Sequence, residues 1–391
     1  MLANWIPLIV TLAIQAMVAM ALLTLPVMAT EVANALNISA SFAGIYVAIV
    51  YLGAMLASLM AGAGVKRFGA IRISQLGLLM CAIGLGLCML PSLLAIAFGA
   101  FFIGIGYGPI TPASSHLLAK TTESHRISLV FSVKQTGVPL GGVLAGVIVP
   151  TLVLSCGWQI ALALVAVCNI LCLLVAQPLT KIFDSDRDRN QSLKIGSLIQ
   201  PVKMVFQYPE LRLMAVCSFM FSMVQLSLTT YLVTYLYTEL SYSLVAAGIV
   251  LSIAQFGGMT GRITWGWVAD RWFGARTTLG GLAILMSLAA LATASMNMHS
   301  SMIIVVAVLV VFGATAIGWN GVYLAEVARQ APEGLASVAT GGTLAITFLG
   351  VVLGPPLFGA IFEISGSYRL GFVLLAVLTA LCAWAIFRKK N

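Results

Sequence analysis

Long runs of apolar residues, separated by short polar breaks, dominate this chain. A bilayer span needs about 20 mostly apolar residues, and in lipid every backbone polar group must be bonded within a helix or a closed barrel. The pattern therefore predicts an all-α membrane protein with twelve transmembrane helices. The predicted spans are 6–28, 41–64, 71–90, 93–119, 127–154, 156–179, 210–238, 243–266, 276–297, 300–328, 334–362 and 366–387.

One long polar break, from Thr180 to Pro209, contains the sequence KIFDSDRDRNQSLK. It divides the predicted helices into two groups of six. We therefore predict an N-terminal six-helix bundle over residues 1–179, a cytoplasmic linker over 180–209 and a C-terminal six-helix bundle over 210–391.

The two halves resemble each other in sequence. The loop after the second predicted helix reads GAGVKRFGAIR (62–72), and the loop after the eighth reads GWVADRWFGAR (266–276). Likewise GVPLGG (137–142) in the fifth helix has a counterpart in GPPLFG (354–359) of the eleventh. Two pseudo-symmetric six-helix bundles are typical of transporters whose substrate site lies near the middle of the membrane.

Composition agrees with a membrane protein. The 391 residues are 61% hydrophobic and 8% charged, against about 25% charged residues in soluble domains. Assigning alternate loops to opposite sides leaves Arg369 alone among Lys and Arg on one side, so the excess of positive charge places both termini and the linker in the cytoplasm. The net charge of +9 then needs no nucleic acid. We expect a multi-pass protein of the plasma (bacterial inner) membrane, surrounded by lipid and monomeric.

Two cations lie inside predicted spans. At 1.5 Å per residue Lys134 lies about 10 Å deep and Arg262 about 12 Å deep. A charge within a span is costly, and it usually marks a functional site. The structural alternatives are that Lys134 extends its side chain to the cytoplasmic surface and that Arg262 pairs with Asp270, two helical turns away.

Taken together, these features resemble the major facilitator superfamily over essentially the full length. The resemblance rests on the six-plus-six plan, the two loop motifs, the GIGYG sequence (104–108) and the Pro-Gly motifs of the fifth and eleventh helices. It departs from the family pattern at Lys66, where the first loop usually has an acid, and at Ala100, where an Arg usually precedes the glycines. The charged residues that usually hold this loop in the family are therefore expected in the C-terminal half only, where Asp270 and Arg271 stand. The family's gating motif falls on Arg67, Gly69, Asp270 and Arg271.

The same resemblance implies that the fifth and eighth helices face each other across a central cavity. Lys134 and Arg262 would then face one another with no acid in either span. Two like charges in a low dielectric repel each other unless an anion or water lies between them. The planar guanidinium of Arg suits a carboxylate, to which it can donate two hydrogen bonds. Arg262, followed by GWVADR, resembles the substrate-binding Arg of the monocarboxylate transporters and the oxalate and formate exchangers.

Other polar and aromatic groups are candidates for lining a cavity, although interhelical hydrogen bonding or packing explains each of them equally well. His116 is a candidate proton site, with a packed histidine as the alternative. The candidate substrate-binding residues besides the two cations are Gln15, Gln255, Tyr231, Tyr235, Trp319, Asn320 and Tyr323, with Gln225 on the same helix as the two tyrosines.

We therefore predict a secondary transporter of a small organic anion, a mono- or dicarboxylate, working by alternating access. No mid-span carboxylate is available as a proton carrier, so a coupled proton would travel on the substrate, through His116 or through a cation, or else the protein exchanges anions. The alternative is a drug or metabolite efflux proton antiporter, which the Pro-Gly motif of the fifth helix resembles. No catalytic set, metal spacing or phosphate loop indicates an enzyme, a metal or a cofactor.

Overall fold

All regular elements of the part of the chain that can be described are helices. The computed structural model describes residues 5–121, 130, 133–185, 187–188, 199–331 and 336–388. Ten helical stretches in these ranges are long and apolar enough to cross a membrane; one of them, Leu244–Ala294, holds two predicted spans, and Phe42–Ser58 is a shorter apolar stretch. The predicted all-α membrane fold is confirmed. The predicted spans 127–154 and 334–362 both begin at residues outside the described ranges.

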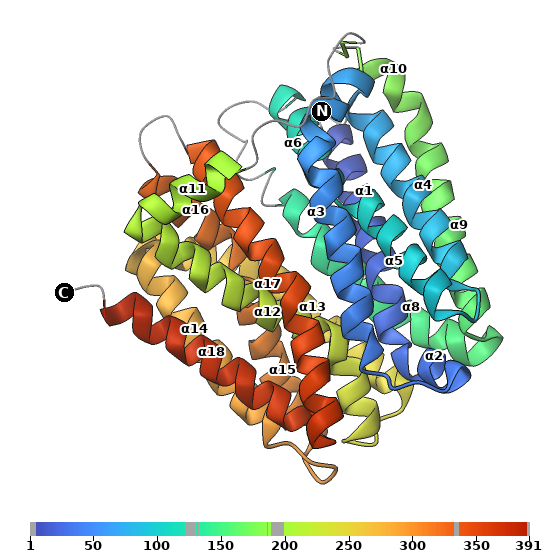
Figure 1. The fold of residues 1–391 in the computed structure, drawn as a ribbon, viewed down its shortest axis with the longest axis vertical. Coiled ribbons are helices and arrows are strands. Elements are labelled where there is room, and N and C mark those ends of the chain that lie inside the picture. The colour runs from blue at the N-terminus through green and yellow to red at the C-terminus, as the bar shows by residue number, and fades with distance from the viewer. Residues whose placement is uncertain are drawn as a thin grey trace. The chain divides into compact units, whose positions relative to one another are not determined.

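The first compact unit comprises residues 1–40 and 46–196. Within it α1 packs on α8 and α9, while α4 packs on α5, α6 and α9, as the blue-to-green part of Figure 1 shows. Its helices are α1 (Ile6–Val27), α2 (Ala29–Leu36), most of α3 (Phe42–Phe68), α4 (Ala70–Cys88), α5 (Leu93–Tyr107), α6 (Ile110–Thr121), α8 (Gly137–Cys156), α9 (Trp158–Ala176) and α10 (Thr180–Phe183).

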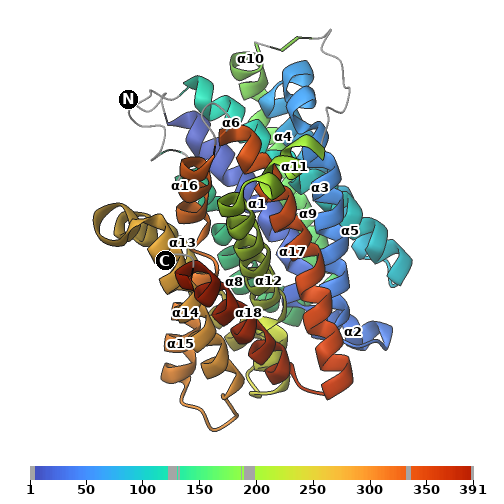
Figure 2. The same ribbon diagram turned by 60° about the vertical axis from the view of Figure 1, so that its left-hand side comes forward.

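The second unit comprises residues 41–45 and 197–391. Within it α12 packs on α17, α13 on α15, and α14 on α18, which Figure 2 shows from another side. Its helices are α11 (Ile199–Gln207), α12 (Pro209–Thr238), α13 (Leu244–Val268), α14 (Gly274–Ala294), α15 (Met302–Ala316), α16 (Asn320–Gln330), α17 (Ala336–Ser365) and α18 (Tyr368–Arg388), with a π-helical turn at Ala269–Phe273 before α14.

The limits of the units differ from the predicted domain limits in two places. Residues 41–45, at the start of α3, group with the second unit. Tyr231 donates a hydrogen bond to the carbonyl of Ser41, and the Ser41 hydroxyl donates to Glu363. Helix α11, which the sequence assigns to the linker, packs on α17 and α12. The division at 179 and 209 stays a prediction.

Two predicted spans are broken helices. The span 93–119 is divided into α5 and α6 at Gly108 and Pro109, and the span 300–328 is divided into α15 and α16 at residues 317–319. Proline has no N–H to continue a helix, and glycine allows the turn. Each break leaves carbonyl groups that the helix itself does not satisfy. In transporters, such interruptions commonly mark the substrate site.

The internal repeat is visible in how the helices pack. Helices α5 and α15 have equal lengths and begin 209 positions apart. A Cβ atom placed on Gly53 of α3 would lie 2.6 Å from the carbonyl oxygen of Phe101, and one on Gly257 of α13 would lie 2.8 Å from that of Val310. Gly53 thus allows α3 to approach α5 closely, and Gly257 allows the same close approach between α13 and α15.

A linker acid holds the first loop motif. The Asp184 carboxylate, only 4% exposed, accepts hydrogen bonds from the backbone N–H groups of Ile71 and Arg72 at the start of α4, both at 2.9 Å. Gly69 has φ of +97°, and a Cβ there would collide with Asp184. The N-terminal half therefore has an acid at this loop after all, although Lys66 stands in the expected position. It caps the helix and stabilises the positive end of its dipole.

Replacing Asp184 should destabilise the first unit. Loss of a cap typically costs about 1 kcal/mol, which corresponds to a fall of about 2–4 °C in the melting temperature of a unit of this size. We expect this fall for Asp184→Ala, and a smaller one for Asp184→Asn, which keeps one acceptor oxygen. The exposed neighbour Ser185 offers the control, Ser185→Ala. Equal melting temperatures for Asp184→Ala and Ser185→Ala would contradict the capping role.

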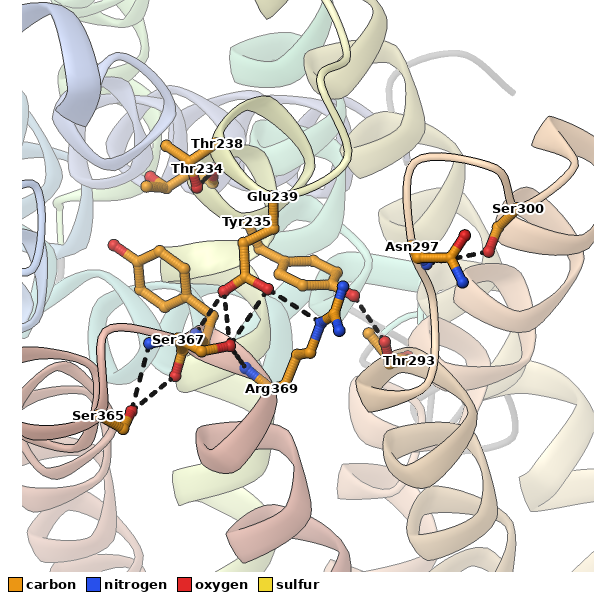
Figure 3. A network of polar contacts seen from close by, with 11 residues as sticks. Thr234, Tyr235, Thr238, Glu239, Thr293, Asn297, Ser300, Ser365, Ser367 and Arg369 are labelled. Atoms are coloured by element: carbon orange, nitrogen blue, oxygen red, sulfur yellow. Dashed lines mark hydrogen bonds and ion pairs between the residues drawn. The ribbon is translucent and has the colours of Figure 1, made fainter.

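A second acid caps α18 in the other unit. Figure 3 shows Glu239, at the end of α12, facing the turn before α18. Its carboxylate accepts hydrogen bonds from the Ser367 hydroxyl at 3.0 Å and the Tyr368 backbone N–H at 2.5 Å, and it pairs with Arg369 at 3.2 Å. Arg369, which the loop pattern isolates from the other cations, therefore has an acid partner.

The cap should contribute more to stability than the ion pair. The Arg369 side chain is 44% exposed, so its pair with Glu239 is weakened by solvent and should contribute less than about 1 kcal/mol. Glu239→Ala removes the partners of three donors, and we expect it to cost about 1–2 kcal/mol. Thermal unfolding of Glu239→Ala and Arg369→Ala tests this order; a larger loss for Arg369→Ala would reverse it.

Candidate substrate-binding site

Lys134 is a buried cation in the first unit. It lies one turn before α8 and is 1% exposed. Its ammonium group donates hydrogen bonds to the side-chain oxygen of Gln15 on α1, at 3.0 Å, and to the hydroxyl of Thr111 on α6, at 3.3 Å. Helices α1, α5, α6 and α8 contain no Asp or Glu. The ammonium group is thus directed at neutral oxygen atoms inside the unit, which argues against extension to the surface.

Close packing of α1 and α8 makes this contact possible. A Cβ atom on Gly137, at the start of α8, would lie 2.9 Å from Cβ of Gln15. Any larger side chain would push α8 away and lengthen the bond from Lys134. Thr111 reaches the same place because it lies in the first turn of α6, which begins directly after the break at Gly108 and Pro109. Its hydroxyl donates to Gln15 at 3.3 Å, which closes a triangle of three side chains.

A second glutamine occupies a similar position in the other unit. The side-chain oxygen of Gln225 on α12 accepts hydrogen bonds from the indole N–H of Trp319, at 3.0 Å, and from the amide of Asn320, at 3.3 Å. Trp319 and Asn320 stand at the break between α15 and α16. Trp319 is held edge-on by Phe221 and Tyr323. The sequence singled out Trp319, Asn320 and Tyr323, and they are neighbours in the structure.

Arg262 reaches the same break from α13. Its Nε atom donates to the carbonyl of Ile317 at 3.2 Å, and Asn320 donates to that carbonyl at 3.5 Å. Asp270 is exposed and forms no ion pair with the residues that the structure describes. The alternative role of Arg262, pairing with Asp270, is therefore not seen within those residues. The backbone carbonyl joins Arg262 to the Gln225 cluster through Asn320.

Several other candidates lie apart from these two groups. Tyr231 and Tyr235 are fully buried, and their hydroxyl groups donate to the carbonyls of Ser41 and Thr293. Gln255 is buried on α13, and His116 is half-buried on α6. Their roles in binding stay predictions, as does the gating role of the loop residues; Arg271 is exposed, and the ion pair of the second loop joins Arg276 to Glu210 at 3.3 Å.

Sequence reasoning did not select Thr111. A threonine in an apolar helix carries no charge signal, and only the preceding Gly-Pro pair indicates that the helix is interrupted there. Lys134 and Arg262 belong to different units, so their facing one another stays a prediction.

The family model described as Major Facilitator Superfamily matches residues 8–347. The chain belongs to the Major Facilitator Superfamily. It is 23% identical over 383 residues to the benzoate transport protein of Acinetobacter baylyi (strain ATCC 33305 / BD413 / ADP1), covering 88% of this chain and 80% of that protein. It is 21% identical over 355 residues to the gentisate transporter of Corynebacterium glutamicum (strain ATCC 13032), covering 89% and 77%.

Solved structures show the same fold. A mutant of nucleoside transporter NupG aligns with a TM-score of 0.79 and 16% identity, over 98% of this chain and all of that one. A bacterial homolog of the human lysosomal transporter Spinster, in an inward-facing and occupied conformation, aligns with a TM-score of 0.75 and 14% identity, over 98% and 96%. This superfamily member is a multi-pass membrane transporter and not an enzyme. These two relatives are named for benzoate and gentisate, so they do not specifically support the monocarboxylate or oxalate–formate branch.

The contacts of Tyr235 predict a structural role for its hydroxyl. Tyr235→Phe removes the hydrogen bond to the carbonyl of Thr293, which Figure 3 shows, and should lower the free energy of unfolding by about 1 kcal/mol. The affinity for a small carboxylate such as benzoate should stay within about twofold of that of the unsubstituted protein, since within the described ranges no hydrogen bond of Tyr235 leads to Lys134, Gln225 or Arg262. Tyr237→Phe, at the half-buried Tyr237 of the same helix, is the control. A tenfold loss of affinity in Tyr235→Phe would instead place this hydroxyl in the binding site.

Proposed function

We propose that the protein is a secondary transporter that carries a small organic anion with a carboxylate group by alternating access. The observation that carries the proposal is the buried ammonium group of Lys134. Burial of a charge is costly unless it is paired or hydrogen-bonded, and the helices that surround Lys134 contain no acid. A substrate carboxylate can accept a charge-assisted hydrogen bond from this ammonium group during part of the transport cycle.

Arg262 supports the same substrate class. Its guanidinium donates through Nε to a backbone carbonyl, which orients the planar group, and such a fork suits a carboxylate. We propose that Lys134 in the first unit and Arg262 in the second are each able to bind a carboxylate. The positive charges of the two units would then favour anions over cations.

The relatives support a finer choice of anion. Both are named as transporters of aromatic acids, benzoate and gentisate. We therefore favour an aromatic carboxylate over the short aliphatic acids suggested by the monocarboxylate and oxalate–formate resemblance. Whether a proton accompanies the substrate or a second anion is exchanged stays a prediction from the sequence.

Binding of benzoate and gentisate to the purified protein tests the proposal. Lys134→Met removes the ammonium group while keeping a long side chain, and we expect affinity to fall ten- to hundredfold, as is usual for loss of a hydrogen bond to a charged group. Arg262→Met should have an effect of similar size. Isothermal titration measures both affinities, and transport in proteoliposomes should fall in parallel.

Exposed cations offer matched controls. Lys120 in the last turn of α6 and Arg187 in the linker are both exposed, so Lys120→Met and Arg187→Met should bind as the unsubstituted protein does. Equal loss of affinity in these controls would mean that total charge determines binding, and not Lys134 and Arg262 in particular. If tetraphenylphosphonium stabilises the protein and no carboxylate does, the efflux alternative replaces the proposal.

A further inference from the structure

Three sulfur-bearing side chains meet inside the second unit. Cys217 and Met220 lie on α12, and Cys382 lies on α18. The Cys382 thiol donates a hydrogen bond to the thioether of Met220, with 3.2 Å between the two sulfur atoms. The same thiol is also hydrogen-bonded to that of Cys217. We call Cys217, Met220 and Cys382 the sulfur cluster.

Helix geometry brings the three sulfur atoms together. Cys217 and Met220 are three positions apart on α12, so their side chains are neighbours on one face of that helix. Helix α18 packs on α12 and places Cys382 against this face. Both helices belong to the second unit. The cluster is therefore complete within one unit of the protein.

The partners of Cys382 differ from those of other thiols in the described ranges. Cys81, Cys88 and Cys156 each donate a hydrogen bond to a backbone carbonyl. Backbone groups are the usual partners of side-chain hydrogen bonds, and a thioether is only a weak acceptor. Cys382 nevertheless bonds to sulfur atoms on two sides. The cluster thus gathers soft donor atoms where a carbonyl would serve an ordinary thiol.

The sulfur cluster lies in apolar surroundings. Cys217 is 3% exposed and Cys382 is 2% exposed, while Met220 is half-buried and is thus the member nearest the surface. The stretches of α12 and α18 that carry the cluster, residues 213–238 and 370–387, contain no charged residue. A charged ligand in an apolar site must be neutralised there. The sulfur atoms themselves must therefore balance the charge of any ion that they bind.

We propose that the sulfur cluster is a binding site for a soft monovalent metal ion, Cu(I). Thiolate and thioether sulfur atoms are the ligands that select Cu(I). On binding, one thiol releases its proton to the solvent, and its sulfur forms a bond to the metal. The charge of this thiolate cancels that of Cu(I), and copper is neither oxidised nor reduced. The bound ion joins α12 to α18, a role that goes beyond the proposed function and does not depend on the substrate.

Competition between the purified full chain and the Cu(I) chelator bicinchoninate tests this site. Under anaerobic, reducing conditions the unsubstituted protein should take Cu(I) from the chelator. A hydroxyl is a poor ligand for Cu(I), so Cys217→Ser and Cys382→Ser should each lower the affinity roughly a hundredfold. Met220→Leu removes a neutral ligand and keeps the thiols, so we expect a smaller loss of about tenfold.

The chain offers matched controls for both kinds of ligand. Cys168 is exposed and Cys172 is half-buried, four positions apart on α9. Met223 lies on α12, where a Cβ atom on Gly354 of α17 would contact it. Cys168→Ser, Cys172→Ser and Met223→Leu should keep the Cu(I) affinity within about twofold. If the affinity falls in the α9 variants and not in those of the sulfur cluster, the ion binds on α9 and the inference is wrong.

Measurements on the unsubstituted protein guard against variants that fail to fold. X-ray absorption of the Cu(I)-loaded chain should show copper bound by sulfur alone, and nitrogen or oxygen ligands would contradict the site. Cu(I) should also raise the melting temperature, because it binds the folded chain, and this rise should be absent in Cys382→Ser. Equal Cu(I) affinity in the unsubstituted protein, Cys217→Ser and Cys382→Ser would overturn the inference. So would a disulfide between Cys217 and Cys382 that forms in place of Cu(I) uptake.

Discussion

Lipid offers no hydrogen-bond partner to a backbone carbonyl or to an ammonium group, so the protein must satisfy both from within. This constraint makes the described elements helices, and it also controls where the helices stop. The breaks after α5 and α15 expose carbonyl groups and polar side chains at membrane depth, where they need partners. Lys134 and Arg262 extend to these two breaks. At the second break, the bond from Arg262 gives the carbonyl of Ile317 a donor. Beside the first break, Lys134 is held by the side-chain oxygens of Gln15 and Thr111.

The halves share this arrangement, but they differ in their chemistry. In the first unit an ammonium group and a hydroxyl orient the amide of Gln15, whereas in the second an indole and an amide orient that of Gln225. Equivalent places in a duplicated fold therefore carry different charges.

Outside these sites, two acidic side chains stabilise the first turns of helices by capping them. Asp184 binds the start of α4 and Glu239 the start of α18, each with a carboxylate that accepts backbone N–H bonds. Asp184 comes from the linker and not from the loop motif, where the family pattern would put an acid. A helix start needs an acceptor in the right place, and it does not matter which segment provides it.

The sequence by itself determined the helical membrane fold, the two groups of spans and the repeat, because apolar length and loop charge are properties of the chain alone. It also identified Lys134 and Arg262, because a charge in an apolar run is visible without coordinates. It could not identify Thr111 as the partner of Gln15, or the carbonyl of Ile317 as that of Arg262, because neither has any signal of charge or spacing. Only the tertiary structure decided that Tyr231 and Tyr235 donate to backbone carbonyls. It also decided that the side-chain oxygens of Gln15 and Gln225 each accept hydrogen bonds from two donors. These hydrogen bonds join residues 55 to 190 positions apart. They depend on how helices pack, and apolar periodicity does not specify that packing.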